Sequence, residues 1–262
     1  MMFFLAAISY TLKSLPPNTG LREPYYFAVA DFGYAGLQVS VFRLVQLSTG
    51  AHLRCLSHSH SLALSGAAVD DLLMQHFYPQ VEEQWVRETK QVDPSFTPPA
   101  DLAELKEVQR LKDRLRNAVE KIKTALSSAP SVSQTVEVHA GETDATLQLT
   151  RTQFDSLIRP LVETELRRVV AAAVRKAIVS IENREEKKEE KKEEKTEEKK
   201  EDKTGDENSK ASTQPAAAPL FTQLPLASLQ ITGGSSRIVL FQTLLQQIFN
   251  EGSSLLFFFF FC

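Results

Sequence analysis

A low-complexity segment at residues 183–219 divides this chain and limits what it can fold into. Its first part repeats pairs of glutamate and lysine, and a stretch rich in alanine, serine, threonine and proline follows. The four-residue period places like charges four positions apart, a spacing that destabilises a helix, and the segment has no apolar face to bury. The sequence therefore predicts a disordered charged insertion, with the folded chain built from residues 25–182 and completed by residues 220–250.

The completing part contains a short apolar strand pattern that ends in residues 233–237 (Gly-Gly-Ser-Ser-Arg), and a helical pattern follows over residues 240–249. A Gly-Gly step lets the backbone approach a ligand closely, because no Cβ is in the way. The N-terminus of the following helix adds unpaired N–H groups. This corner is either a nucleotide seat or an ordinary strand-to-helix turn, and so short a glycine motif does not decide between them.

Apolar runs and period-two alternation predict two β-hairpins and one further strand. In the further strand, His58 and His60 stand two residues apart among serines. That spacing suits a metal pair, but no additional ligand stands nearby in the sequence, so an exposed strand face is the favoured interpretation and no metal site is predicted. The hairpins join residues 25–31 to 37–44 and residues 135–139 to 145–149, and the further strand covers residues 51–64.

Apolar residues at steps of three and four predict three long helices in the first part of the chain. They begin near Gly66, at Asp101, which is a fair N-cap residue, and near residue 150. Pro79 should kink or split the first of these helices, and Pro160 should disturb the start of the third. Together with the strands, they predict a mixed α/β fold in which long helices pack on a β-sheet.

Composition bears on partners and location. The formal net charge is −3, which gives no electrostatic reason to expect nucleic-acid binding. No apolar run reaches the roughly 18 residues that a membrane span needs, so no membrane association is predicted. The two cysteines are Cys55 and Cys262, one of them at the extreme terminus, and they imply no disulfide framework. A reducing compartment, the cytoplasm, is therefore the expected location.

The two ends of the chain show no regular pattern. Residues 1–24 read as an irregular segment, and residues 251–262 include five consecutive phenylalanines. Such an apolar run is an aggregation liability in a folded domain. We interpret residues 251–262 as an aberrant apolar tail, and one hypothesis is that a homopolymeric stretch was translated after a frame error.

The order of the pieces resembles one half of a known domain. The chain is similar to the second lobe of the nucleotide-binding domain of the 70-kDa heat-shock (DnaK-type) chaperones, nearest the large 110-kDa branch. Three stretches carry the resemblance: the turn at residues 31–36 (Asp-Phe-Gly-Tyr-Ala-Gly), the helix end at residues 120–128 (Glu-Lys-Ile-Lys-Thr-Ala-Leu-Ser-Ser) and the corner at residues 233–238. It covers about Phe27 to Phe249 and implies lobe II of an actin-like, two-lobed ATPase.

The resemblance also implies a ligand, ATP or ADP, and a site. The turn would lie beside the phosphates, the helix would meet the ribose and the adenine edge, and the corner would pack against the nucleoside with its arginine along the base. Without the resemblance, Glu120 and Lys123 read as an exposed ion pair on one helix face. The implied site residues are Asp31, Gly33, Gly36, Gly66, Glu120, Lys123, Ser127, Gly233, Gly234, Ser235 and Arg237.

Several positions depart from the family pattern. Tyr34 and Ala35 stand where the family has glycines in the phosphate turn, Thr124 replaces an arginine that stacks on adenine, and Val239 replaces a proline. The acidic pair usual at the start of the helix at Gly66 is missing, and so are the first lobe and its catalytic lysine. The resemblance therefore implies that this chain alone does not hydrolyse ATP, so no catalytic residue is predicted.

The expected function is that of a divergent, truncated heat-shock chaperone. It would bind ATP or ADP weakly and act in protein folding or in nucleotide exchange, with a 70-kDa chaperone or an unfolded client as its partner. One alternative is a non-enzymatic interaction module in which the Glu/Lys segment serves as a solubilising tether. Another is a gene fragment without function.

Overall fold

The computed structural model of the chain describes residues 25–47, 50–98, 105–139, 143–197, 224, 226–250 and 256–259. Within these ranges the predicted mixed α/β fold is confirmed, because β-strands pack against long helices. The elements in chain order are β1 (Tyr25–Phe32), β2 (Leu37–Leu47), β3 (Gly50–Ser61), α2 (Gly66–Val92), α3 (Lys106–Leu126), β4 (Ser131–His139), β5 (Thr143–Thr150), α4 (Arg151–Glu197), β6 (Leu226–Thr232), the 3₁₀ turn η2 (Gly234–Arg237), α5 (Val239–Asn250) and β7 (Leu256–Phe259).

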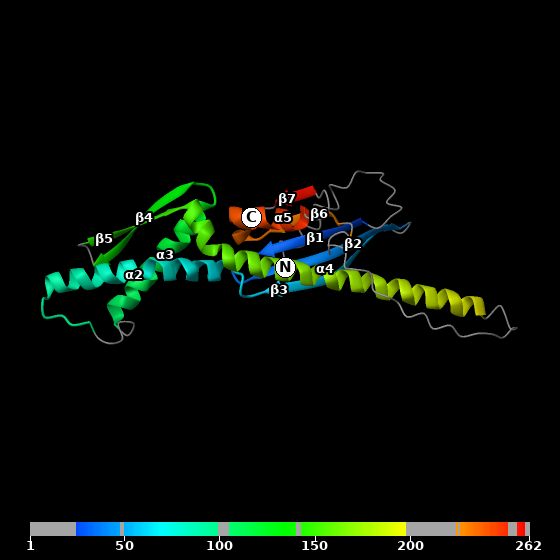
Figure 1. The fold of residues 1–262 in the computed structure, drawn as a ribbon, viewed down its shortest axis with the longest axis horizontal. Coiled ribbons are helices and arrows are strands. Elements are labelled where there is room, and N and C mark those ends of the chain that lie inside the picture. Colours follow the sequence, from blue (N-terminus) through cyan, green and yellow to red (C-terminus); the bar gives the residue numbers. More distant parts are fainter. Residues whose placement is uncertain are drawn as a thin grey trace.

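Five of the described strands form one sheet in the order β3-β2-β1-β6-β7 (Figure 1). The strands β1, β2 and β3 follow one another antiparallel, which confirms the first predicted hairpin and the third strand. β6 pairs in parallel with β1, and Thr232 at its end lies opposite Asp31. This pairing brings the glycine corner after β6 next to the turn after β1.

The main core lies on the face of this sheet that packs against α4 and α5. The predicted apolar stripe of α4, from Phe154 to Ala177, is buried there. Small residues let α4 approach β3 closely: the Ser57 hydroxyl on β3 donates to the Ala173 carbonyl of α4 at 2.6 Å. His58, on the opposite face of β3, is exposed as the sequence predicted.

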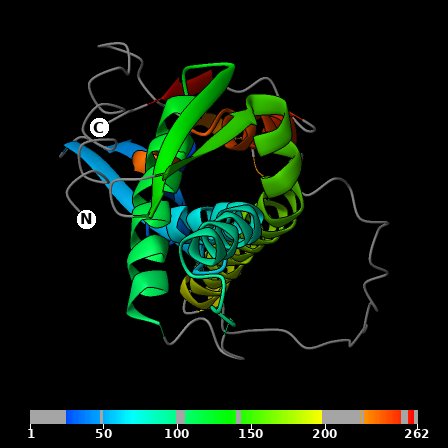
Figure 2. The same ribbon diagram turned by 90° about the vertical axis from the view of Figure 1, so that its left-hand side faces the viewer.

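The helices α2 and α3 and the hairpin β4–β5 form the other end of the molecule (Figure 1). Figure 2 looks along α2 and α4 and shows α3 running across them. The hairpin confirms the second predicted pair of strands. The predicted apolar stripe of α3 is buried, and its members are Val108, Leu111, Leu115, Ala118, Val119, Ile122 and Leu126.

Neither helix-internal proline ends its helix, so the predicted splitting at Pro79 is wrong, while a kink at Pro79 and a disturbance at Pro160 stay predictions. α2 continues through Pro79 to Val92, and α4 continues through Pro160. Both prolines lie on exposed helix faces. The carbonyl groups that lose their intrahelical partner there face solvent, and water can satisfy them.

Two predicted helix boundaries are also corrected. α3 begins at Lys106 with Leu105 at the N-cap position, whereas Asp101, the predicted N-cap, lies outside the described residues. α4 extends to Glu197, so the first part of the predicted disordered insertion is helical. Glu and Lys are good helix formers, and they extend a helix that the buried stripe has already nucleated. Residues 198–219 lie outside the described residues.

Part of the phenylalanine run forms a strand, so the prediction of an aberrant tail is wrong for that part. Leu256–Phe259 form β7, which pairs in parallel with β6 from Ser228 to Ile231. Aromatic residues favour strands, and without this pairing β6 would present an open edge. The remaining positions of the predicted irregular ends, residues 1–24, 251–255 and 260–262, lie outside the described residues. Among the described helices, none is long and apolar enough to cross a membrane.

Candidate functional site

The glycine corner between β6 and α5 is held tightly by its own chain. Gly233 has φ of 97°, a left-handed conformation that side chains other than hydrogen rarely adopt. A Cβ on Gly233 would also collide with the Phe32 carbonyl and with Asp31 Oδ1 of β1. The Ser236 hydroxyl donates to the Gly233 carbonyl at 2.6 Å and closes the turn. Gly233 is therefore required by the fold itself.

The helix predicted over residues 240–249 is confirmed as α5, which starts at Val239. The 3₁₀ turn Gly234–Arg237 lies between the glycine pair and this helix. The ligand seat at the N-terminus of the helix stays a prediction. What faces outward at the corner is Gly234, where an added Cβ would meet nothing within 4 Å.

A cavity of about 230 Å³, here called the corner cavity, lies between this corner and α3. It brings together three stretches that are far apart in the chain: the turn after β1, the C-terminal half of α3 and the corner. Its lining residues are Tyr34, Glu120, Lys123, Thr124, Ser127, Gly234, Ser235, Arg237 and Ile238. Six of the predicted site residues are thus brought together, and their roles toward a ligand remain predictions.

Lys123 is the most constrained side chain of the corner cavity. Its Nζ lies 2.7 Å from each carboxylate oxygen of Asp70 and 3.2 Å from the Gly66 carbonyl oxygen. Nζ donates to Asp70 Oδ2 and to the Gly66 carbonyl, while Asp70 Oδ1 makes an ion-pair contact without a hydrogen bond. The structure thus pairs Lys123 with Asp70 of α2, not with Glu120 as in the surface alternative. Lys123 clamps α3 to the start of α2.

Gly66 marks the point where α2, the turn and the corner meet. A Cβ there would collide with the Ser235 hydroxyl and crowd the Tyr34 backbone. The Gly66 N–H donates to the Gly33 carbonyl at 3.0 Å, and the Ala67 N–H donates to the Tyr34 carbonyl at 3.0 Å. Gly66 therefore serves the close packing of three segments and does not line the corner cavity.

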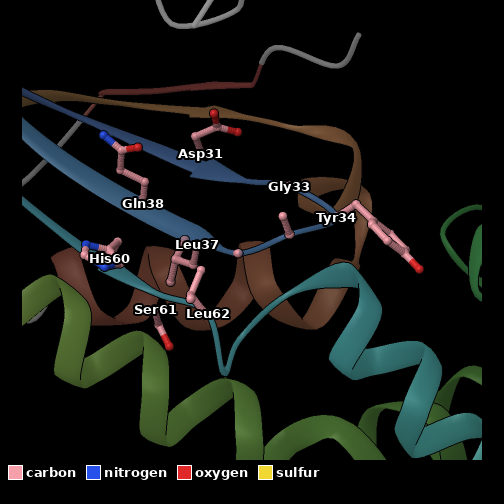
Figure 3. Close-up of a pocket in the computed structure, with 10 residues that line it drawn as sticks. Asp31, Gly33, Tyr34, Leu37, Gln38, His60, Ser61 and Leu62 are labelled. Atoms are coloured by element: carbon pink, nitrogen blue, oxygen red, sulfur yellow. The ribbon is translucent and has the colours of Figure 1, made fainter.

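A second cavity, here called the turn cavity, has a volume of about 550 Å³ and lies on the other side of the turn. Figure 3 shows it with Asp31 at the end of β1 and with the Tyr34 side chain directed away from Asp31 and Gln38. Burial raises the pKa of the Asp31 carboxyl. The lining residues are Asp31, Gly33, Tyr34, Ala35, Gly36, Leu37, Gln38, His60, Ser61 and Leu62.

Three of these predicted residues, Asp31, Gly33 and Gly36, fall in the turn cavity, and Gly66 and Gly233 pack between segments. Sequence reasoning missed two residues that shape the site. Asp70 comes two residues after the positions of the expected acidic pair, Ala67 and Ala68, and carries no local signal of its pairing with Lys123. Arg151 donates to the carbonyls of Leu126 at 3.0 Å and Ala129 at 2.9 Å, and so holds the C-terminal end of α3.

Comparisons with known proteins show which family this chain is similar to. A protein-family model described as "Hsp70 protein" matches residues 5–186. The chain is 26% identical to "Heat shock 70 kDa protein 15" of Arabidopsis thaliana over 179 residues, which is 68% of this chain and 18% of the relative. It is likewise 26% identical to "Heat shock 70 kDa protein 14" of the same plant over 168 residues, or 63% of this chain and 18% of the relative.

The extent of these matches limits what they show about the site. The chain spans about a fifth of the length of the two curated relatives. The family match covers β1 to the buried part of α4 and ends before the glycine corner. The reason to include the corner in the site is therefore structural and does not come from the family match. The parallel pairing of β6 with β1 places the corner against the turn and α3.

Proposed function

The chain belongs to the Hsp70 family, and from this premise we propose that it binds the adenosine part of an adenine nucleotide in the corner cavity. One observation carries the proposal: α3 and the glycine corner, distant in sequence, line a single cavity at which Gly234 leaves room that its own fold does not use. The family match supports the ligand class, since the family predicted from the sequence binds ATP and ADP.

The lining residues suit a nucleoside. The Glu120 carboxylate can accept hydrogen bonds from ribose hydroxyl groups. The Ser127 hydroxyl, which donates to the Lys123 carbonyl at 3.4 Å, can accept one as well. The Arg237 guanidinium is planar and can stack on a base, and Ile238 adds an apolar wall. Ser127 is the C-cap residue of α3 and comes seven residues after Glu120, or about two helical turns, so both lie on the same side of the helix.

In this proposal Lys123 is a positioning residue. Its ammonium group is occupied by Asp70 and Gly66, so it fixes the distance between α3 and the start of α2. The predicted direct contact of Lys123 with an adenine nitrogen is therefore replaced by an indirect role. We propose that Glu120, Ser127 and Arg237 contact the ligand directly.

Isothermal titration of the full chain with adenosine and with ADP tests the proposal. Ser127→Ala removes a hydroxyl from the corner cavity, and Ser128→Ala removes one from the next, exposed position. We expect Ser127→Ala to weaken adenosine binding by about 1 kcal/mol, roughly fivefold, and Ser128→Ala to leave it unchanged. Absence of binding heat with every adenine ligand, for a protein whose circular dichroism shows it folded, refutes the proposal.

A second candidate function is partner binding, which the protrusion of α4 favours. α4 runs past the sheet and continues to Glu197 as a helix of alternating glutamate and lysine pairs (Figure 1). We propose that this arm contacts a 70-kDa chaperone or an unfolded client in the cytoplasm, in a folding or nucleotide-exchange role. Pull-down with a 70-kDa chaperone as bait should succeed for the full chain and fail after deletion of residues 183–210, and equal recovery of both refutes the role of the arm.

A further inference from the structure

Tyr34 stands where the two cavities of the site meet. It lines both the corner cavity and the turn cavity, and its side chain is 64% exposed. Its ring lies over the Lys123 ammonium, 5.6 Å from Nζ to the ring centroid. A ligand that fills the corner cavity and extends toward the turn must pass this ring.

We propose that the site accepts adenosine or AMP and discriminates against ADP and ATP, because the side of the site that faces the turn is unable to hold a polyphosphate. This inference rests on the proposed function and narrows its ligand class. The affinity falls with each added phosphate group. Three features of the turn and of its surroundings support this order.

The first feature is the charge of the turn cavity. Among its ten described lining residues, Asp31 is a carboxylic acid and there is no lysine or arginine. Phosphate groups are held in proteins by guanidinium or ammonium groups, or by free backbone N–H groups. A triphosphate directed along this turn would bring its negative charges toward Asp31, and like charges repel.

The second feature is that several of the backbone donors around the turn are already used. The Gly33 N–H donates to the Gly36 carbonyl at 2.9 Å. The first N–H groups of α2, at Gly66 and Ala67, donate to carbonyls of the turn, and the Ala68 N–H donates to the Ser65 hydroxyl at 3.0 Å. The N-terminus of α2 faces the turn without offering these donors to an anion.

The third feature is that Lys123 is neutralised. Its side chain is 12% exposed, and both oxygens of Asp70 lie 2.7 Å from Nζ. The Tyr34 ring covers the same ammonium group from the side of the turn. The positive charge of Lys123 is therefore neutralised within the protein, and it attracts a phosphate chain only weakly.

Titration calorimetry of the full chain with adenosine, AMP, ADP and ATP, each at the same ionic strength, tests the inference. We expect adenosine to bind at least tenfold more tightly than ATP. If ATP binds as tightly as adenosine or more tightly, the discrimination is refuted while the proposed function stands. If none of the four ligands binds to the folded chain, the proposed function fails and this inference fails with it.

A pair of variants tests the physical cause. Asp70→Asn frees the charge of Lys123, whereas Asp71→Asn removes the same charge from the neighbouring, exposed position. We expect Asp70→Asn to reduce the ratio of adenosine affinity to ATP affinity at least threefold, because ATP binds more tightly. Asp71→Asn should leave this ratio unchanged. Equal ratios in both variants refute the role given to Lys123. Circular dichroism verifies that each variant is folded, and the wild-type titration does not depend on them.

Discussion

The two neighbouring glycines of the corner have different structural roles. Gly233 has a positive φ and lies against the β1 backbone, so the fold needs it. Gly234 faces open space in the corner cavity, so the fold would tolerate a methyl group there. One Gly-Gly pair thus combines a structural position with a position that a ligand can use.

This difference gives a prediction for two alanine variants. Gly233→Ala should destabilise the protein by about 1–3 kcal/mol, because alanine strains this backbone region and collides with Phe32. Gly234→Ala should change the free energy of unfolding by less than about 0.5 kcal/mol and should weaken adenosine binding. Urea unfolding and calorimetry measure the two effects. Equal destabilisation by both variants contradicts the assignment.

The half-buried carboxyl of Asp31 gives a pH prediction. Burial raises the pKa of Asp31 in the folded state, so the protonated form favours folding. The stability gained in this way is present in full below the ordinary pKa of aspartate, and it is lost as the pH rises through the folded pKa. Asp31→Asn resembles the neutral form at every pH.

We therefore expect Asp31→Asn to match the wild-type Tm at about pH 3 and to exceed it at about pH 7, where the wild-type carboxyl is ionised. Thermal melts followed by circular dichroism at both pH values measure the difference. Asp144→Asn, on the hairpin away from both cavities, is the matched control. A Tm difference that is the same at both pH values contradicts the prediction.

At the scale of elements, the buried stripes of α3 and α4 and both hairpins could be predicted, because their apolar period reports directly which face is buried. The spacing of Glu120, Lys123 and Ser127 also placed them correctly on one helix face. The pairing of Lys123 with Asp70 could not be predicted, since it depends on how α2 crosses α3. The extension of α4 depends on a helix nucleated earlier in the chain.

β7 gives a prediction at this scale. Phe258 lies opposite Gln230 of β6 in the parallel pairing. Phe258→Pro removes a backbone donor and strains the strand, whereas Phe258→Val keeps a residue that favours strands. Each hydrogen bond lost costs about 1 kcal/mol, which corresponds to ~2–4 °C in Tm.

We expect Phe258→Pro to lower the Tm and to increase light scattering on heating, since the edge of β6 becomes open. Phe258→Val should behave as the wild type in both measurements. A Phe258→Pro protein that melts and scatters like the Val variant would show that β7 contributes nothing to the sheet.

At the scale of the whole molecule, α4 connects the two ends of the fold and then leaves it. Among the α4 residues whose burial the structure describes, which reach Arg184, the last buried one is Ala177, while the helix continues to Glu197. We therefore expect the core to be complete without the charged part of the helix, and the arm to be removable without loss of the fold.

We expect replacement of residues 183–219 by a Gly/Ser linker of equal length to change the Tm by less than about 2 °C, the equivalent of roughly 0.5–1 kcal/mol. The helical signal in far-UV circular dichroism should fall, because the helical turns up to Glu197 are lost. Replacement with the scrambled native composition is the control for composition alone. A large drop in Tm for the linker protein would place the charged segment within the folded unit.

The parallel pairing of β1 with β6 sets the order in which this protein can be built. Tyr26 lies beside Leu226, so about 200 further residues must leave the ribosome after β1 before β6 can pair with it. Until then β1 has one unpaired edge, while α2, α3 and the β4–β5 hairpin can form from local contacts. The nascent chain is therefore most exposed to mispairing at β1 just before β6 emerges.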